Sequence, residues 1–364
     1  MSAVVAVIGV ILIFMTFRDA FVSILLPRTV RSATRLSNRL NIAMWTVYSA
    51  FVRPGSRRED MRLSLYGPFS IVALIATWAA LLILGFTLLV LGLGITIHGQ
   101  PADFSEVLYY SGVTFLTLGY GDLTLDGTLG HMLSVIEAGI GFGFLAVLVA
   151  YLPVLYQSFS RREVLITLMD ARAGSPPSGG ELLQRFTEHD DWEGLQSWLE
   201  RWETWAAELL ETHLSYPVLV SYRSQHADTS WLCAMTSIMD ACAILLAAVP
   251  VDEGCKSARR QAHLTFAMCR HAAIDISQVF RVNFQRTHER LERSEFTRLA
   301  ESLKGNGLVL GQDDACWNEL LRLRAMYEPV VVALSHHFRL RTPAWTKDPN
   351  EKDNWETGIL DSHL

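Results

Sequence analysis

Basic residues are missing from the middle of this 364-residue chain. No lysine or arginine lies between Leu63 and Ser160. Half of all residues are apolar and the mean hydropathy is positive, which is high for a soluble protein of this size. The stretch therefore predicts a membrane domain joined to a soluble part. Its few acids are Asp103, Glu106, Asp122, Asp126 and Glu137.

Paired cysteines are also missing. The cysteines are odd in number and none forms a Cys-x-x-Cys pair, which disfavours a disulfide framework or a zinc knuckle and predicts reduced cytoplasmic thiols. They all lie in the charged C-terminal half: Cys233, Cys242, Cys255, Cys269 and Cys316. That half carries more acids than bases, and this argues against binding to nucleic acid.

Two apolar runs are long enough to cross a membrane, for which a helix needs about 20 residues. They extend from Pro68 to Ile97 and from Thr128 to Tyr156. A third run, Ala3 to Leu26, is interrupted by the charged pair Arg18 and Asp19. We expect this run to span as well, with the pair at the level of the lipid headgroups. An interfacial helix is the alternative.

Arginines set the orientation. The linker 27–66 is rich in arginine and contains only two acids, which predicts a cytoplasmic location. Its apolar centre, residues 40–52, is too short to cross and is expected along the membrane surface. The first four arginines stand among polar residues, so we predict weak voltage dependence. The full set is Arg28, Arg31, Arg35, Arg39, Arg53, Arg57, Arg58 and Arg62.

The segment 173–180 consists of turn-forming and small residues, and we expect a domain boundary there. Farther along, apolar residues recur at helical spacing and strand alternation is scarce. The expected organisation is an N-terminal membrane helix (1–26), the basic cytoplasmic or interfacial linker (27–66), a membrane domain (67–160), a second linker (161–180) and a helical cytoplasmic domain (181–364). The expected fold class is therefore all-α.

A short helix is expected between the two strong spans. Asp103 followed by Glu106 has the spacing of a capping box, and the helix would end near Phe115. Such a helix is too short to cross the membrane and must be re-entrant. Its C-terminal end would carry partial negative charge toward the membrane centre, where a cation is favoured.

The segment that follows this helix is Thr117-Leu-Gly-Tyr-Gly-Asp122. Here the chain resembles the potassium channel pore family, in which two spanning helices flank a re-entrant helix and a T-x-G-Y-G-D filter. Glycines at positions 119 and 121 permit backbone angles that let successive carbonyls turn inward. The likeness covers roughly residues 66–160 and is prokaryotic-like, whereas the helical cytoplasmic domain is unfamiliar.

The resemblance implies a homotetramer around one pore. It also implies that carbonyl oxygens replace the water shell of potassium ions; these belong to Thr117, Leu118, Gly119 and Tyr120, with the hydroxyl of Thr117 and with Asp122 completing the motif after Gly121. Leu118 stands where valine is usual, and tyrosines at 109 and 110 stand where tryptophans often brace the filter. Val113 replaces a carboxylate of some relatives and leaves Asp122 without that partner.

Further residues are candidates for supporting or gating the filter. Thr114, Tyr110 and Glu137 are the filter-support candidates. Glu137 is included because an acid within a membrane is functional by default. Counted from the filter, Gly141 falls where family members have a gating hinge. Gly139 and Gly143 flank it on the same helix. Small residues also permit close helix packing, so hinge and packing both remain open.

In the cytoplasmic half, one stripe and one helix define the expected core. The stripe recurs at helical steps of three and four: Leu195, Trp198, Trp202, Trp205 and Leu209. Core packing is the favoured interpretation and a subunit contact the rival. The apolar segment 230–249 contains Asp240 and is expected as a buried core helix rather than a further span.

A buried Asp240 needs a partner. The candidates are His226, His263, Arg270 and His271, with His271 and Asp275 at spacing four on one helical face. An internal salt bridge is favoured over a metal or ligand sensor. A regulatory ligand of the cytoplasmic domain therefore stays an open expectation.

We expect a potassium-selective channel subunit of the inner membrane that is gated through its cytoplasmic domain. No nucleophile–base pair, phosphate-cradling loop or metal-ligand spacing stands out, so an enzyme is not expected. No cofactor is expected beyond the permeant potassium ions, and the partners are the lipid bilayer and further copies of the chain. The alternatives are a membrane receptor or sensor with a pore-like domain and a weakly selective cation channel.

Overall fold

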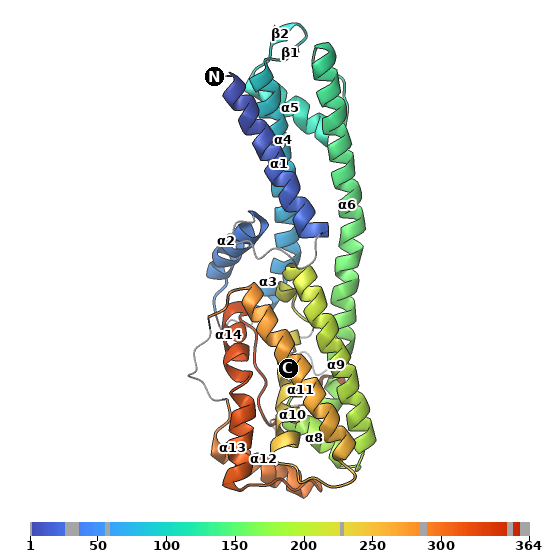
Figure 1. Ribbon diagram of the computed structural model, residues 1–364, viewed down its shortest axis with the longest axis vertical. Coiled ribbons are helices and arrows are strands. Elements are labelled where there is room, and N and C mark those ends of the chain that lie inside the picture. The colour runs from blue at the N-terminus through green and yellow to red at the C-terminus, as the bar shows by residue number, and fades with distance from the viewer. Residues whose placement is uncertain are drawn as a thin grey trace. The chain divides into compact units, whose positions relative to one another are not determined.

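The computed structural model describes residues 2–25, 36–54, 59–225, 229–283, 290–347 and 352–356. The chain divides into two compact units, Met1–Gln157 and Ser158–Leu364, which we call the membrane unit and the C-terminal unit. Helices make up nearly all of the described regular structure (Figure 1), so the predicted all-α class is confirmed. Some residues named above lie outside the described ranges: Arg28, Arg31, Arg35, Arg57, Arg58 and His226.

The membrane unit contains the first helices of the chain. They are α1 (Ser2–Leu25), α2 (Leu36–Phe51), α3 (Glu59–Ser64), α4 (Tyr66–Leu93), α5 (Phe104–Phe115) and most of α6 (Gly127–Thr167), with the short strands β1 (Thr96–Ile97) and β2 (Gln100–Pro101) between α4 and α5. Within the described residues, three stretches are long and apolar enough to cross a membrane: Ala3–Ile24, Glu59–Leu93 and Gly127–Ala173. The first of these is the run that the sequence predicted to span, with an interfacial helix as the alternative.

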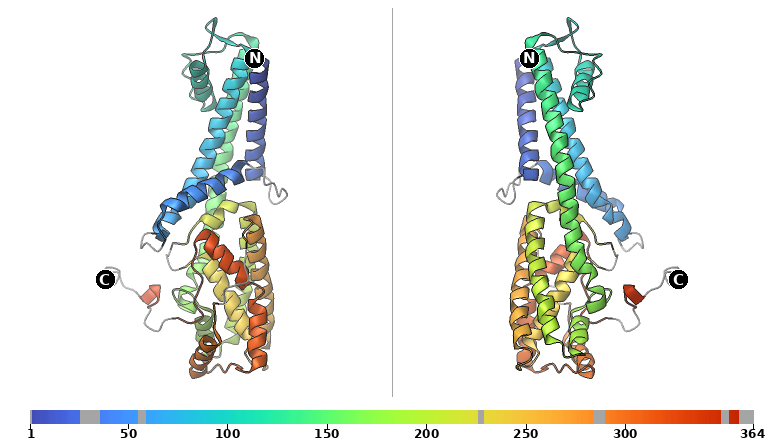
Figure 2. Two further views of the ribbon diagram at one scale, coloured as in Figure 1. Left: turned by 90° about the vertical axis from the view of Figure 1, so that its left-hand side faces the viewer. Right: turned by 90° about the vertical axis from the view of Figure 1, so that its right-hand side faces the viewer.

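Helix α1 packs tightly along α4, as both views in Figure 2 make visible. Glycines permit this approach, because a methyl group at Gly92 would lie 2.2 Å from the amide nitrogen of Ala6. At the other end of the contact, the buried carboxylate of Asp19 accepts hydrogen bonds from the Trp78 indole (2.9 Å) and from the Ser37 amide (3.1 Å). One acid therefore joins α1, α2 and α4.

The C-terminal unit is a helical domain around one apolar core. Its elements are the end of α6, α7 (Asp170–Ala173), α8 (Gly179–Thr187), α9 (Trp192–Ser215), η1 (Pro217–Ser221), α10 (Trp231–Ala247), α11 (Lys256–Val279), α12 (Arg293–Gly305), α13 (Asp314–Arg324), α14 (Glu328–Phe338) and η2 (Asn354–Glu356). The predicted stripe from Leu195 to Leu209 lies in this core. Helix α10 is buried almost throughout, so both predictions of core packing are confirmed.

The glycine- and proline-containing segment 173–180 is not an open linker. It is largely buried inside the C-terminal unit, and the division of the chain falls earlier, between Gln157 and Ser158. Gly179 is the reason for the close fit, since a Cβ there would lie 2.7 Å from the amide nitrogen of Ala241 on α10. These small residues allow packing here rather than free motion.

The predicted partners of Asp240 are wrong where the structure describes them. Asp240 is fully buried, and the Arg290 guanidinium donates to both of its carboxylate oxygens, at 2.7 and 3.1 Å. Tyr327 adds its hydroxyl. Arg270 instead donates to the carbonyl of Met326 (3.1 Å), and His271 lies 3.6 Å from Asp275. The expectation of an internal salt bridge holds, but with Arg290 as the cation.

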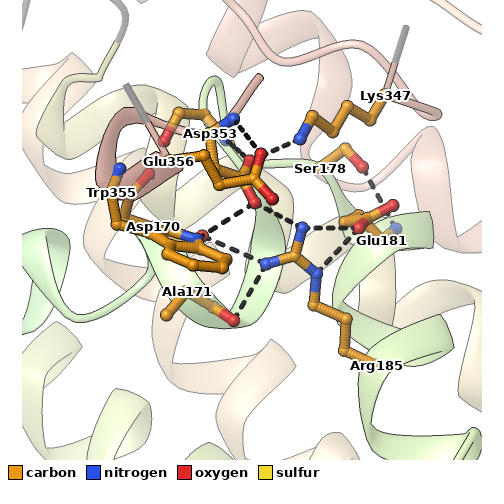
Figure 3. Close-up of polar contacts among 10 residues, drawn as sticks. Asp170, Ala171, Ser178, Glu181, Arg185, Lys347, Asp353, Trp355 and Glu356 are labelled. Carbon is orange, nitrogen blue, oxygen red and sulfur yellow. Dashed lines mark hydrogen bonds and ion pairs between the residues drawn. The ribbon is translucent and has the colours of Figure 1, made fainter. Parts of the chain in front are cut away.

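A second polar cluster attaches residues 352–356 to the start of the C-terminal unit (Figure 3). We call it the C-terminal clasp. Asp353 accepts from the Arg185 guanidinium (2.7 Å), the Lys347 ammonium (2.5 Å) and the Ser175 amide (3.0 Å). The Trp355 amide donates to Asp170 of α7 at 3.1 Å. The clasp thereby holds a segment near the C-terminus against the residues that follow α6.

Candidate functional site

The re-entrant helix α5 has the cap that its sequence predicts. The Asp103 side chain accepts from the Glu106 amide at 2.8 Å, and the Glu106 carboxylate accepts from the Asp103 amide at 3.1 Å. This reciprocal pair satisfies two orphan donors and fixes where the helix begins. The helix covers 12 residues and ends at Phe115, so the predicted capping box and extent are confirmed.

Residues 117–122, which we call the filter segment after the motif that they resemble, follow α5 directly. The Thr117 amide donates to the Thr114 carbonyl at 3.0 Å and the Leu118 amide to the Val113 carbonyl at 2.9 Å. These bonds tie the first filter residues to the last turn of the helix. Thr114 thus contacts the filter through its main chain.

The backbone of the filter segment alternates between positive and other φ angles. Thr117 has φ of 56°, Gly119 of 59° and Gly121 of 77°, whereas Leu118 and Tyr120 between them are not positive. In a regular strand successive residues face opposite sides, but an alternation of this kind lets successive carbonyls turn to one side. The glycines take these angles without steric cost. Sequence reasoning missed that Thr117 adopts such an angle too.

Asp122, the last residue of the motif, has a partner that sequence reasoning did not assign. The Tyr109 hydroxyl donates to its carboxylate at 2.9 Å. The two residues are 13 positions apart, so the bond ties the far end of the filter segment back to α5. The aromatic position noted in the sequence thus supplies the contact that Val113 lacks.

One stripe of α6 faces α5, with residues at steps of three and four. Tyr110 bonds Ser134 through their hydroxyls. The Ser111 hydroxyl contacts the carboxyl oxygen Oε1 of Glu137, which is fully buried. A turn farther along α6, a methyl group at Gly141 would lie 1.9 Å from the carbonyl oxygen of Phe115.

The three neighbouring glycines of α6 at positions 139, 141 and 143 therefore differ. Gly141 lies against the end of α5 with no room for a side chain, whereas Cβ atoms at Gly139 and Gly143 would meet nothing within 4 Å in a single chain. Gly141 is therefore closely packed in this structure, and its role as a gating hinge stays a prediction. Pro153 also lies inside α6, where the missing amide removes one helical hydrogen bond. The sequence contains this proline, but sequence reasoning gave it no role.

Within the C-terminal unit, the end of α6 is held by Arg162. This buried guanidinium donates to the carbonyls of Leu219 (2.8 Å) and Tyr222 (2.7 Å) and lies 2.9 Å from Glu163. Burial and the charge of Arg162 hold the pKa of His213 well below its usual value. The Trp205 indole donates to the Arg162 carbonyl at 3.0 Å. These contacts fasten the last turns of α6 to α9 and η1.

The described residues contain no group of three histidines, cysteines or acids that is placed to hold a metal ion. The groups that the candidate site offers are main-chain oxygens. Residues 117–120 supply four successive carbonyls, next to the C-terminal end of a helix whose dipole favours a cation.

Comparisons with known proteins bear on the membrane unit. Residues 74–157 match the family model Ion_trans_2, described as an ion channel, so the resemblance to a two-helix channel family is confirmed over that range. The "Uncharacterized membrane protein YdjJ" of Bacillus subtilis (strain 168) is 23% identical over 192 residues, which are 52% of this chain and 55% of the relative. The chain thus spans about half the length of that relative. No solved structure matches the chain.

Proposed function

We propose, from the ion channel domain that residues 74–157 form, that this protein is one subunit of a tetrameric potassium channel. The chain crosses the cell membrane several times, and its C-terminal unit lies in the cytoplasm. The pore opens through the C-terminal unit rather than through voltage. The protein catalyses no reaction and binds no nucleic acid.

The observation that carries the proposal is the backbone of residues 117–121. Positive φ angles at every second residue let the carbonyls of Thr117, Leu118, Gly119 and Tyr120 line one side of the segment. Four such segments around an axis would replace the water shell of a dehydrated potassium ion. One segment cannot enclose an ion, and this supports closed symmetric assembly.

The exposed apolar surface of the single chain supports assembly as well. Only 11% of the apolar window in Gly127–Ala173 is buried, compared with 28% and 33% for the other two candidate spans. The side chains of Leu118 and Tyr120 are also exposed. A second copy packed against α6 and the filter segment would cover this surface.

Gating through the C-terminal unit rests on α6. This helix runs from Gly127 to Thr167 without a break, and its last turns are fastened by Arg162 to α9 and η1. A change in the C-terminal unit would therefore act on the helix that lines the pore. The stimulus would be a ligand or partner of that unit.

Potassium flux into vesicles that contain the purified full chain tests the proposal. We expect potassium to pass much faster than sodium. The variant Gly119→Ala should abolish the flux, because alanine is strained at a φ of 59°. Gly112→Ala is the matched control: Gly112 lies in α5 with open space around it, and flux should persist.

One further readout completes this test. Native mass spectrometry should give four chains per particle. A protein that stays monomeric, or that passes sodium as readily as potassium, contradicts the proposal. A tetramer that passes no ions would favour a receptor with a pore-like domain.

A further inference from the structure

Glu137 is a buried acid that has no ion-pair partner among the described residues. Its side chain is fully buried in the membrane unit, and no lysine or arginine occurs between residues 63 and 160. One carboxyl oxygen, Oε1, contacts the Ser111 hydroxyl. The other, Oε2, has no hydrogen-bond partner among the described residues. An ionised carboxylate in this place would be almost unsolvated and unpaired, which is costly in an apolar interior.

The Ser111 hydroxyl makes two contacts but carries one hydrogen. The Ser111 oxygen also lies 3.1 Å from the main-chain carbonyl of Ile83 on α4. A carbonyl oxygen only accepts, so the hydrogen in that contact belongs to Ser111. A serine hydroxyl carries a single hydrogen. When Ser111 gives this hydrogen to Ile83, the hydrogen in the contact between Ser111 and Glu137 comes from Glu137.

We propose that Glu137 is a neutral carboxylic acid that donates its proton from Oε1 to the Ser111 hydroxyl. Ser111 in turn donates to the Ile83 carbonyl, and Oε2 is the uncharged carbonyl oxygen, which tolerates the lack of a partner better than a carboxylate oxygen does. In this relay each hydrogen bond is donated in the same direction, from α6 to α5 and from α5 to α4. It positions the re-entrant helix that holds the filter. This role in ion flux rests on the channel function proposed above.

The relay lies on the stripe of α6 that also contacts α5 through Ser134 and Gly141. These neighbours are neutral, so no charge along the stripe compensates a carboxylate. Glu137 is therefore a positioning residue. It acts through Ser111 on α5 rather than on the ion.

Infrared difference spectroscopy of the full chain in lipid vesicles tests the protonation state. The spectrum of the wild type minus Glu137→Gln should contain the carbonyl stretch of a protonated carboxylic acid. Glu106→Gln is the matched control, because Glu106 is an exposed acid of the membrane unit on α5, the helix of Ser111, and glutamine also completes a capping box. Its difference spectrum should contain only bands of an ionised carboxylate.

Substitutions test the positioning role. Glu137→Gln keeps a donor and should keep the potassium flux, whereas Glu137→Ala should lower it about tenfold, which corresponds to one lost buried hydrogen bond. Ser111→Ala should shift the acid band, because the Glu137 proton loses its acceptor. This variant keeps the test open if Glu137→Gln does not fold.

Carboxylate bands in place of the acid band for Glu137 would overturn the inference. So would equal flux in Glu137→Gln and Glu137→Ala. The spectrum reports on Glu137 whether or not ions pass, so an acid band in a protein without flux would refute the channel function and leave the protonation state intact.

Discussion

The two units bury acids in opposite ways. In the membrane unit Glu137 contacts a hydroxyl and no cation. In the C-terminal unit Asp240 receives two hydrogen bonds from Arg290, and Glu328 lies 3.2 Å from Arg290 and 2.9 Å from Arg324. In the membrane unit the contacts of α6 with α5 rest on Gly141 and on hydroxyls, and one carboxylate, Asp19, joins α1, α2 and α4. The C-terminal unit uses charge networks, which specify which segments meet.

The network around Asp240 draws together segments that are far apart in the sequence. It joins α10, the segment that precedes α12, and α14. The guanidinium carbons of Arg290 and Arg324 lie 5.5 and 5.4 Å from the centre of the Trp345 ring. Burial alone would lower the pKa of Arg290, but the charge of Asp240 raises it overall. Burial raises the pKa of Glu328 despite its two cations.

Breaking this charge network should have the largest effect. Arg290→Met leaves Asp240 buried and unpaired, so we expect the free energy of unfolding of the C-terminal unit to fall by about 3–5 kcal/mol. Urea unfolding of the full chain, followed by tryptophan fluorescence, measures the change. Arg298→Met is the control, since the Arg298 side chain is 72% exposed, and it should change the value by less than about 0.5 kcal/mol. Equal losses of unfolding free energy in the two variants would mean that the buried pair contributes no more to stability than an exposed arginine.

The C-terminal clasp sharpens the comparison through pH. Burial alone would raise the pKa of Asp353, but Lys347 and Arg185 lower it overall. A lowered folded pKa means that the stabilisation is complete above the unfolded value of about 4 and is lost as the pH falls through the folded value. Asp353→Asn should cost about 1.5–3 kcal/mol at neutral pH.

This cost should shrink as the solution is acidified below about pH 4, because the wild-type carboxylate then becomes neutral as well. Thermal unfolding of both proteins across that range gives the difference. Glu301→Gln removes an exposed acid and should show no such pH dependence. A constant difference between wild type and Asp353→Asn at all pH values would contradict the ionic account.

Close packing in the membrane unit can be tested by adding one methyl group. Gly141→Ala would push against the Phe115 carbonyl, and such overpacking costs about 1–3 kcal/mol. We expect reduced potassium flux and a lower midpoint of thermal unfolding. Gly139→Ala, with open space around its Cβ, should leave both unchanged. If Gly139→Ala were the more harmful change, the contact of α6 with α5 would not be the critical one.

The sequence was informative where a pattern is local. Long apolar runs without basic residues predicted the spans, and the spacing of Asp103 and Glu106 predicted the cap of α5. Pairings between distant segments were not predictable. Arg290 is 50 positions from Asp240, and helical periodicity gives a face but not its partner. The segment 173–180 was misleading for a similar reason, since glycine permits both turns and close packing.

Removing a hydroxyl contact inside the C-terminal unit should change the free energy of unfolding least. This variant tests whether the cost depends on the type of interaction or on its location. Ser178 is buried and caps α8 by accepting from the Glu181 amide at 3.1 Å. Ser178→Ala should cost about 1 kcal/mol, as for other lost helix caps, and the loss should not depend on pH. Urea unfolding measures it beside Arg290→Met. A cost as large as that of Arg290→Met would mean that burial alone, and not charge, sets the size of these effects.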